Sequence, residues 1–189
     1  MSELSLHTLA GCSLAIAAYP RFRYDASGGR GAGRLAEAGA PGAQALCFDP
    51  ASLIIPPLDG RSTRFLGLPL PPGLSISIHP RQLEGTIDAA TGVISLRFRA
   101  RFRFAIGALY RAPDLIVDTT LSTGSVQGRR HSGRGEPLDG EGRAVLVGVG
   151  TIAPCGDPWL DRFLGLPDEA QALLRCRFMP LAAEGPDLP

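Results

Sequence analysis

The 189-residue sequence contains neither lysine nor asparagine, and all 19 of its basic residues are arginine. Because lysine and asparagine have AT-rich codons, a GC-rich genome explains both absences and weakens any argument that arginine was selected for its forked geometry. The absence of asparagine excludes N-linked glycosylation. With a formal net charge of only +1, the chain has no overall field that would attract nucleic acid or an anionic membrane. Any electrostatic attraction must therefore be local.

The chain also lacks patterns typical of metal-binding, disulfide-bonded and membrane proteins. Its four cysteines show no CxxC or CxxxC spacing and lie beside apolar residues, so we expect free, buried thiols and no zinc site. They are Cys12, Cys47, Cys155 and Cys176. The N-terminus carries Glu3 and no basic segment, and no apolar run reaches the roughly 18 residues of a membrane span. We expect a cytoplasmic protein without a transmembrane segment.

No recognised catalytic or cofactor motif occurs. The GRGAGR sequence within 25–44 lacks the GK[ST] of a phosphate loop and the full GxGxxG spacing, and GxSxG is absent. The three histidines, His7, His79 and His131, do not have the spacing of a shared metal site. We therefore predict no catalytic residue, no cofactor and no metal, and an enzyme is only the third functional hypothesis.

The most informative stretch is TGVISLRFRARFRFAI at 91–106. Apolar and polar residues alternate through it, which predicts a half-buried β-strand. Its polar face carries a ladder of four arginines, Arg97, Arg99, Arg101 and Arg103. This strand is expected to organise the rest of the sheet.

Similar alternation or β-branched content predicts further strands, and turn residues predict how they connect. We expect strands at 12–24, 74–78, 83–87, 115–123 and 144–152, and long polar loops at 25–44 and 127–143. The segment from Asp88 to Gly92 predicts a hairpin into the central strand. A second hairpin is expected between the central strand and 115–123. If its register places Arg101 opposite Asp118, that carboxylate could pair directly with the ladder. Asp157 and Pro158 are typical of a helix start, and a short helix is predicted over 167–175.

The hexapeptide RFLGLP occurs at 64–69 and again at 162–167. The repeat indicates an internal duplication, with related halves at about 12–80 and 94–178, although shared packing chemistry without common descent is an alternative. In both interpretations its phenylalanine and leucines are expected to contact the core. The sequence therefore predicts an all-β fold, in one domain over 1–189. We expect an antiparallel barrel or sandwich of two related halves with one short C-terminal helix.

Two uses of this fold are proposed from the sequence. In the first, a non-enzymatic binding or accessory module recognises an acidic protein or anionic ligand through a basic sheet face formed by the ladder together with Arg21 and Arg23. In the second, a β-barrel carries a small apolar ligand. Its lining would be Phe22, Phe98, Phe102 and Phe104. Arginines on a solvated strand would also protect against aggregation without any ligand. Nucleic-acid binding would require aromatic side chains among the arginines of this face, and because only Tyr19 qualifies, no nucleic acid is expected.

The phrases TGVISLRFRARFRF, LYRAPDLIVDTTLSTG and DRFLGLPDEA resemble uncharacterised conserved proteins of cyanobacteria. The resemblance covers the C-terminal half and implies no activity, substrate or cofactor. It would make a role near pigment or photosynthetic assembly worth testing.

Overall fold

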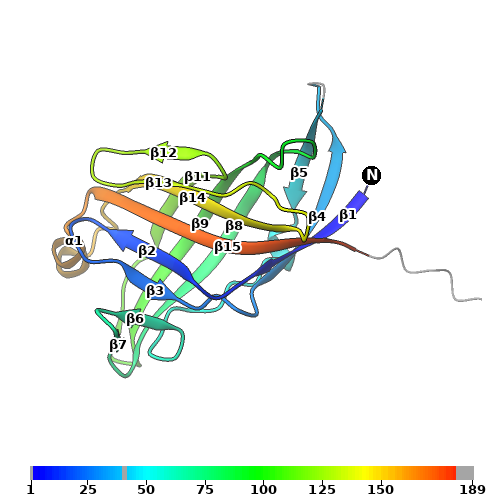
Figure 1. Ribbon diagram of the computed structural model, residues 1–189. Helices are drawn as coiled ribbons and strands as arrows, with labels where there is room; N and C mark the ends of the chain where they lie inside the picture. The colour runs from blue at the N-terminus through cyan, green and yellow to red at the C-terminus, as the bar shows by residue number, and fades with distance from the viewer. Residues whose placement is uncertain (1, 40–41, 182–189) are drawn as a thin grey trace, which may run out of the picture.

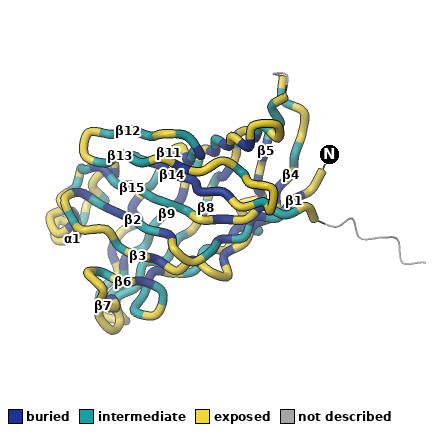
Figure 2. The backbone as a smooth tube through the Cα atoms, in the orientation of Figure 1, coloured by how far each residue is buried: buried dark blue, intermediate teal, exposed yellow. Residues whose placement is uncertain are grey.

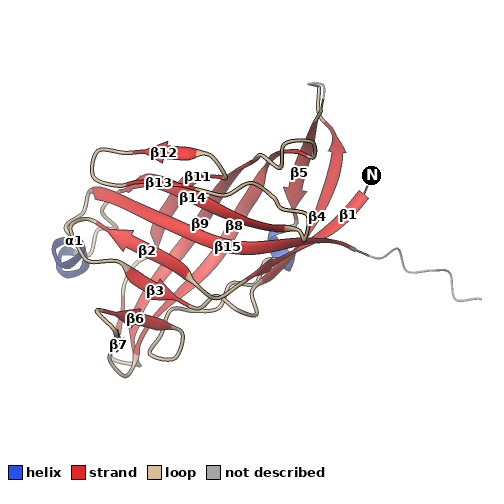
Figure 3. Cartoon of the chain, in the orientation of Figure 1, coloured by secondary structure: helices blue, strands red, loops and turns tan. Residues whose placement is uncertain are grey.

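The structure is a computed structural model that describes residues 2–39 and 42–181. It confirms an all-β chain with one short α-helix near the C-terminal end, α1 at Pro158–Leu164 (Figure 3). A 3-10 turn, η1, covers Pro50–Ser52. The strands are β1 Ser2–Thr8, β2 Cys12–Ile16, β3 Phe22–Tyr24, β4 Arg30–Glu37, β5 Ala43–Phe48, β6 Thr63–Phe65, β7 Leu68–Pro69, β8 Leu74–Asp88, β9 Ile94–Ile106, β10 Tyr110–Arg111, β11 Leu115–Ser122, β12 Ser125–Gln127, β13 Ser132–Arg134, β14 Arg143–Ile152 and β15 Asp168–Pro180.

Eight of these strands pair in a closed antiparallel circuit, in the order β1, β4, β5, β8, β9, β11, β14, β15 and back to β1 (Figure 1). One edge of β15 has two partners. Its C-terminal half pairs with β1, whereas its N-terminal half pairs with β2, from which β3, β6 and β7 continue the sheet. The sheet therefore divides beside β15, with β4 and β5 at one end of the molecule and β6, β7 and α1 at the other (Figure 1).

The central strand and its first hairpin are as predicted. Buried and exposed residues alternate along β9, with Ile94 and Leu96 fully buried. In the turn before it, the Asp88 carboxylate accepts hydrogen bonds from the backbone N–H groups of Ala90 and Thr91. Gly92 completes the turn with φ of 71°, a conformation that glycine adopts without steric cost.

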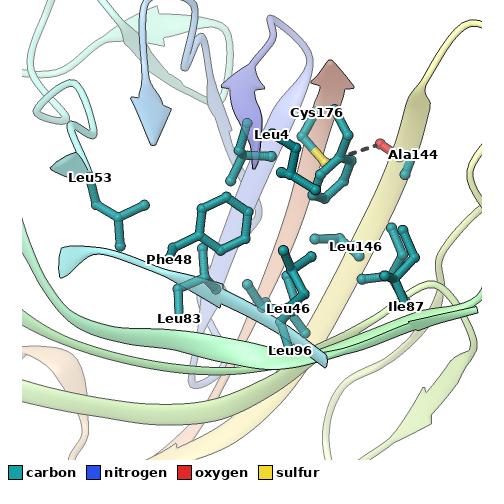
Figure 4. Close-up of a cluster of buried hydrophobic side chains, with 14 residues drawn as sticks. Leu4, Leu46, Phe48, Leu53, Leu83, Ile87, Leu96, Ala144, Leu146 and Cys176 are labelled. Carbon is teal, nitrogen blue, oxygen red and sulfur yellow. Dashed lines mark hydrogen bonds between the residues drawn. The ribbon is translucent and has the colours of Figure 1, made fainter. Parts of the chain in front are cut away.

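The interior contains three hydrophobic clusters, of which the largest fills the end formed by β1, β4 and β5 (Figure 4). Phe48 belongs to this cluster and is 1% exposed. An added Cβ at Gly33 would lie 2.9 Å or less from two atoms of the Phe48 ring. Glycine in β4 therefore makes room for this aromatic side chain. This close packing explains why 25–44 is not the predicted loop, since β4 occupies Arg30–Glu37.

At the opposite end, α1 covers the interior with one face. Asp157 caps the helix by accepting a hydrogen bond from the Leu160 N–H, and Pro158 is its first residue, as the sequence predicts. Leu160 and Leu164 are buried and pack against Phe104. The turns around α1 and the β6–β7 hairpin are largely exposed (Figure 2).

The predicted helix over 167–175 is wrong, because β15 occupies Asp168–Pro180. β15 pairs with β14 along ten residues, from Asp168 to Arg177, and with β2 and β1 on its other edge. Hydrogen bonding on both edges outweighs the helix propensity of the AQALL sequence.

Two strand boundaries also differ from the predictions. The 12–24 segment is a hairpin of β2 and β3 rather than one strand, with Ala17 in its turn at φ of 48°. The 74–78 and 83–87 segments form one continuous strand, β8, because a register shift between Pro80 and Gln82 accommodates the proline. A bulge tolerates proline because it leaves one residue outside the hydrogen-bonded ladder.

The two RFLGLP copies have different structures. Residues 64–69 form the β6–β7 hairpin, whereas 162–167 end α1 and lead into β15. The prediction that both leucines contact the core is wrong for the first copy, where Leu66 and Leu68 are among the most exposed apolar residues. In the second copy, Leu164 is buried. The common origin of the two halves stays a prediction.

The β12–β13 hairpin, which replaces part of the predicted 127–143 loop, covers the outer surface of β14 and β15. The hairpin connection is hydrogen-bonded to Glu169, a buried residue on β15. The carboxylate accepts hydrogen bonds from three consecutive backbone N–H groups, those of Arg129 at 2.8 Å, Arg130 at 3.1 Å and His131 at 2.6 Å. These contacts tie the connection between β12 and β13 to the sheet.

Candidate functional site: a basic cleft at the edge of β8

The arginine ladder of β9 is largely neutralised by two aspartates of the neighbouring chain segment. Arg97 donates two hydrogen bonds to Asp118, at 3.1 and 3.0 Å, and Arg99 lies 3.1 Å from the same carboxylate. Arg103 binds Asp114 in the same forked manner, at 2.9 and 3.3 Å. The hydrogen bonds from Arg97 and Arg103 lower the pKa of their respective aspartates. Three of the four ladder arginines therefore have a carboxylate partner.

The register considered from the sequence for this hairpin differs by two residues from the observed one. Asp118 lies opposite Arg99, and Ile116 lies opposite Arg101. Alternation fixes which face a side chain occupies, but a shift of two residues preserves that face. The sequence pattern could not distinguish these registers. In the observed one, Asp118 contacts both Arg97 and Arg99.

Arg101 is the ladder arginine without an ion pair in the described part of the chain. It lines a cleft of about 490 Å³. On the polar side, His79, Arg81 and Arg103 with its partner Asp114 also line this cleft. Apolar lining comes from Leu53, Ile54 and Ile55, which follow η1, and from Pro50, Ile78 and Pro80. Arg81 also has no carboxylate partner among residues 2–39 and 42–181.

The cleft lies beside a stretch of β8 whose outer edge has no strand partner among residues 2–39 and 42–181. On this edge, β5 pairs only with residues 84–88 of β8. An isolated bridge between Leu58 and Ile76 lies nearer the N-terminal end of the strand. Ile76 exchanges both backbone hydrogen bonds with Leu58. Because the hydrogen-bonding direction alternates along an antiparallel strand, the N–H and C=O of Ile78 point to this same side. The register shift after Pro80 keeps the edge irregular.

The structure does not bring Arg21 and Arg23 to the ladder. Arg23 lies on β3, opposite Arg64 of β6, and is exposed. Arg21 donates a hydrogen bond of 2.8 Å to the side chain of Gln171 on β15. Along the sheet, β15 lies three strand pairings from β9, and β3 lies five pairings from it, so the six arginines occupy more than one region of the surface.

The four phenylalanines of the carrier hypothesis are distributed among the three interior clusters. Phe98 packs in the first, Phe102 and Phe104 in the second and Phe22 in the third, where it stacks on Phe65 at 4.6 Å. The cleft at the β8 edge has none of the four in its lining. A second surface hollow, beside Arg97, Asp118 and the β12–β13 hairpin, also has none of them.

Sequence reasoning did not single out Arg81, and it considered His79 only as a metal ligand. The signal that could have found them is Pro80, since a proline inside an alternating stretch indicates a bulge or an edge. His79 lies opposite Arg101 in the β8–β9 ladder. The strand that forms one wall of the cleft therefore carries two further basic side chains, on either side of the proline.

Comparisons with known proteins do not assign this site. No family model matches the chain, and no curated protein or solved structure shows significant similarity to it. The resemblance to cyanobacterial proteins stays a prediction. Within the described ranges, no helix is both long and apolar enough to cross a membrane.

Proposed function

We propose that the protein is a non-enzymatic binding module that recognises an acidic partner protein through the cleft at the β8 edge. The observation that carries this proposal is the placement of Arg101 and Arg81, two arginines without carboxylate partners in the described chain, on one cleft of about 490 Å³. Unpaired guanidinium groups on a concave surface favour carboxylate ligands, which they bind with forked geometry. Of the basic face predicted from the sequence, the proposed site includes Arg101 and Arg103, and it adds Arg81.

The ligand that fits best is a short extended segment with acidic side chains. From the alternation along β8, we infer that the N–H and C=O of Ile78 point toward the cleft, and neither has a hydrogen-bond partner within the described residues. A strand edge of this kind binds an extended peptide by continuing the sheet. The apolar side chains of Ile54 and Ile55 would contact the peptide between its acidic residues. Backbone pairing would supply affinity, and the arginines would supply the preference for acidic side chains.

We further infer that the closed circuit of eight strands is a barrel rather than a sandwich, since pairing of β1 with β15 leaves no free edge within the circuit.

The second candidate, a carrier of a small apolar ligand within this barrel, has weaker support because its predicted lining residues pack against other side chains. The protective role of exposed arginines applies best to Arg97 and Arg99, which share one carboxylate.

The test is a binding titration with a fluorescent peptide of alternating glutamate and valine, measured by anisotropy. The native protein should bind it, and added salt should weaken binding because exposed charges are screened over about 8 Å at physiological ionic strength. A peptide with glutamine in place of glutamate should bind much less. Arg81→Glu combined with Arg101→Glu should abolish binding while the melting temperature stays nearly unchanged.

The matched control is Arg23→Glu, a charge reversal on an exposed strand outside the cleft. It should bind the peptide as the native protein does. Equal loss of binding in the control and in the cleft variant would indicate a diffuse charge effect and would refute the cleft as the site. Co-purification of an apolar small molecule, sensitive to Phe104→Leu but not to salt, would favour the carrier instead.

A further inference from the structure

Five large apolar side chains are exposed in α1, in the β6–β7 hairpin and in the turn after β9. The helix and the hairpin lie toward the same end of the molecule (Figure 1). Their exposed fractions are 71% for Leu66, 69% for Leu68, 94% for Leu109, 51% for Trp159 and 46% for Phe163. We call these five residues the apolar rim. Single exposed apolar residues are ordinary on protein surfaces, but a group at one end indicates an interaction site.

The rim residues belong to three elements, the β6–β7 hairpin, the turn between β9 and β10, and α1. Trp159 and Phe163 stack at 5.2 Å on the outer face of α1, and Trp159 lies 5.3 Å from the Tyr110 ring, which adjoins Leu109. The turn that holds Leu109 is joined to the chain after β7 by a hydrogen bond of 2.8 Å from the Gly107 N–H to the Gly73 carbonyl. The rim therefore lies on one side of the fold.

The conformation of Leu66 is difficult to explain by folding alone. Leu66 and Gly67 form a two-residue hairpin turn in which both residues have positive φ, 52° and 82°. Asparagine, aspartate or glycine is favoured at the first position of such a turn, whereas a leucine there is strained. A residue that is strained, apolar and exposed contributes little to the isolated fold. Strain of this kind indicates a function.

The charges beside the rim favour an anionic surface. Arg64, Arg111 and Arg162 are exposed and form no ion pair in the described residues. The nearby carboxylates of Asp157 and Asp161 accept backbone hydrogen bonds at the start of α1 and in the turn before it. They keep their negative charge, so these three arginines and two aspartates together carry three positive and two negative charges, a net charge of +1. Both RFLGLP copies contribute here, since each supplies an arginine followed by rim residues.

We propose that the apolar rim docks the protein on the surface of an anionic lipid bilayer. Apolar side chains on separate projections can each enter the interfacial region, whereas a protein partner would require one continuous, closely packed surface. Tryptophan suits this position because its ring is apolar and its N–H remains hydrated. The flanking arginines would contact lipid phosphates, and each such contact adds to the attraction. This role is independent of the cleft at the β8 edge.

Trp159 is the sole tryptophan and reports on binding directly. Vesicles of phosphatidylcholine with phosphatidylglycerol should shift its emission to shorter wavelength and co-sediment with the protein, whereas vesicles of phosphatidylcholine alone should do so much less. Combining Leu66→Asn with Leu109→Ser should lower the partition coefficient by about tenfold or more, since two apolar side chains no longer leave water. Asparagine suits the turn, so the variant should fold.

The matched control is Ile116→Asn, which removes an apolar side chain of 51% exposure from β11; it should leave partitioning unchanged. Failure of the native protein to associate with anionic vesicles would overturn the proposal, as would native partitioning by the Leu66→Asn, Leu109→Ser variant. Self-association without vesicles, abolished in that same variant, would instead identify the rim as a contact between copies and would also overturn it.

Discussion

Replacing Glu169 by glutamine should release the β12–β13 hairpin from the sheet. The Glu169 carboxylate accepts three backbone N–H groups at 2.6–3.1 Å. An added Cβ at Gly128 would lie 2.3 Å from one carboxylate oxygen, so glycine permits the approach. A glutamine side chain offers one acceptor oxygen without charge, and its amide nitrogen would face N–H donors. Since a hydrogen bond to a charged group contributes about 1.5–3 kcal/mol, we expect the variant to lose about 2 kcal/mol.

The pH dependence gives an independent test of the same contacts. Burial raises the pKa of Glu169, but the hydrogen bonds from the His131, Arg129 and Arg130 N–H groups outweigh it and lower the pKa overall. A carboxylate with a lowered folded-state pKa stabilises the fold above its unfolded-state pKa, and the contribution disappears as pH falls through the folded-state value. The difference between native protein and Glu169→Gln should therefore be constant near neutral pH and shrink in acid.

Urea denaturation measures the free energy of unfolding, and amide hydrogen exchange reports on Arg129, Arg130 and His131 directly. The control is Glu136→Gln, an exposed glutamate in the segment after β13, which should change neither quantity. Faster exchange at the three amides with little change in global stability would show that the hairpin opens on its own. Native stability together with native exchange in Glu169→Gln would refute the role assigned to the carboxylate.

Two further predictions test the strand phase and the cysteines. Leu96→Ala on β9 should cost about 2–5 kcal/mol, because Leu96 is fully buried, whereas exposed Arg101→Ala should change stability by no more than about 0.5 kcal/mol. If urea denaturation showed the same loss of unfolding free energy for both variants, the assignment of the buried and exposed faces of β9 would be contradicted. The expectation that the cysteines are buried is wrong for Cys47, which is exposed. A thiol reagent at neutral pH, followed by mass spectrometry, should therefore modify Cys47 before buried Cys176, whose pKa burial raises to about 12. Equal rates would contradict the burial of Cys176.

Residues close in sequence determined the features that were predicted correctly. Alternation in 94–106 fixed the two faces of β9, since successive side chains of a strand point in opposite directions. The turn from Asp88 to Gly92 and the cap formed by Asp157 and Pro158 also depend on contacts within five residues. The overall all-β class followed from many such local patterns.

The candidate site was only partly visible in the sequence. The ladder arginines could be read from the alternation, but their partners could not, because the distance from β9 to Asp114 and Asp118 depends on the hairpin register. Arg81 becomes part of the cleft only because β5 ends its pairing with β8 at Glu84 and leaves the edge open. Both facts depend on how segments distant in sequence pair.

Tertiary structure also decided the conformation of segments whose local signals were weak or misleading. The sequence of 167–175 favours a helix by propensity, yet hydrogen bonding to β14 and to β2 makes it a strand. The glycine-rich 30–37 stretch becomes β4 because Phe48 packs against its glycines. The same six residues, RFLGLP, form a hairpin in one place and a helix end in another. A sequence of this length cannot fix its own conformation, because its dihedral preferences differ by less free energy than the pairing and burial supplied by its neighbours.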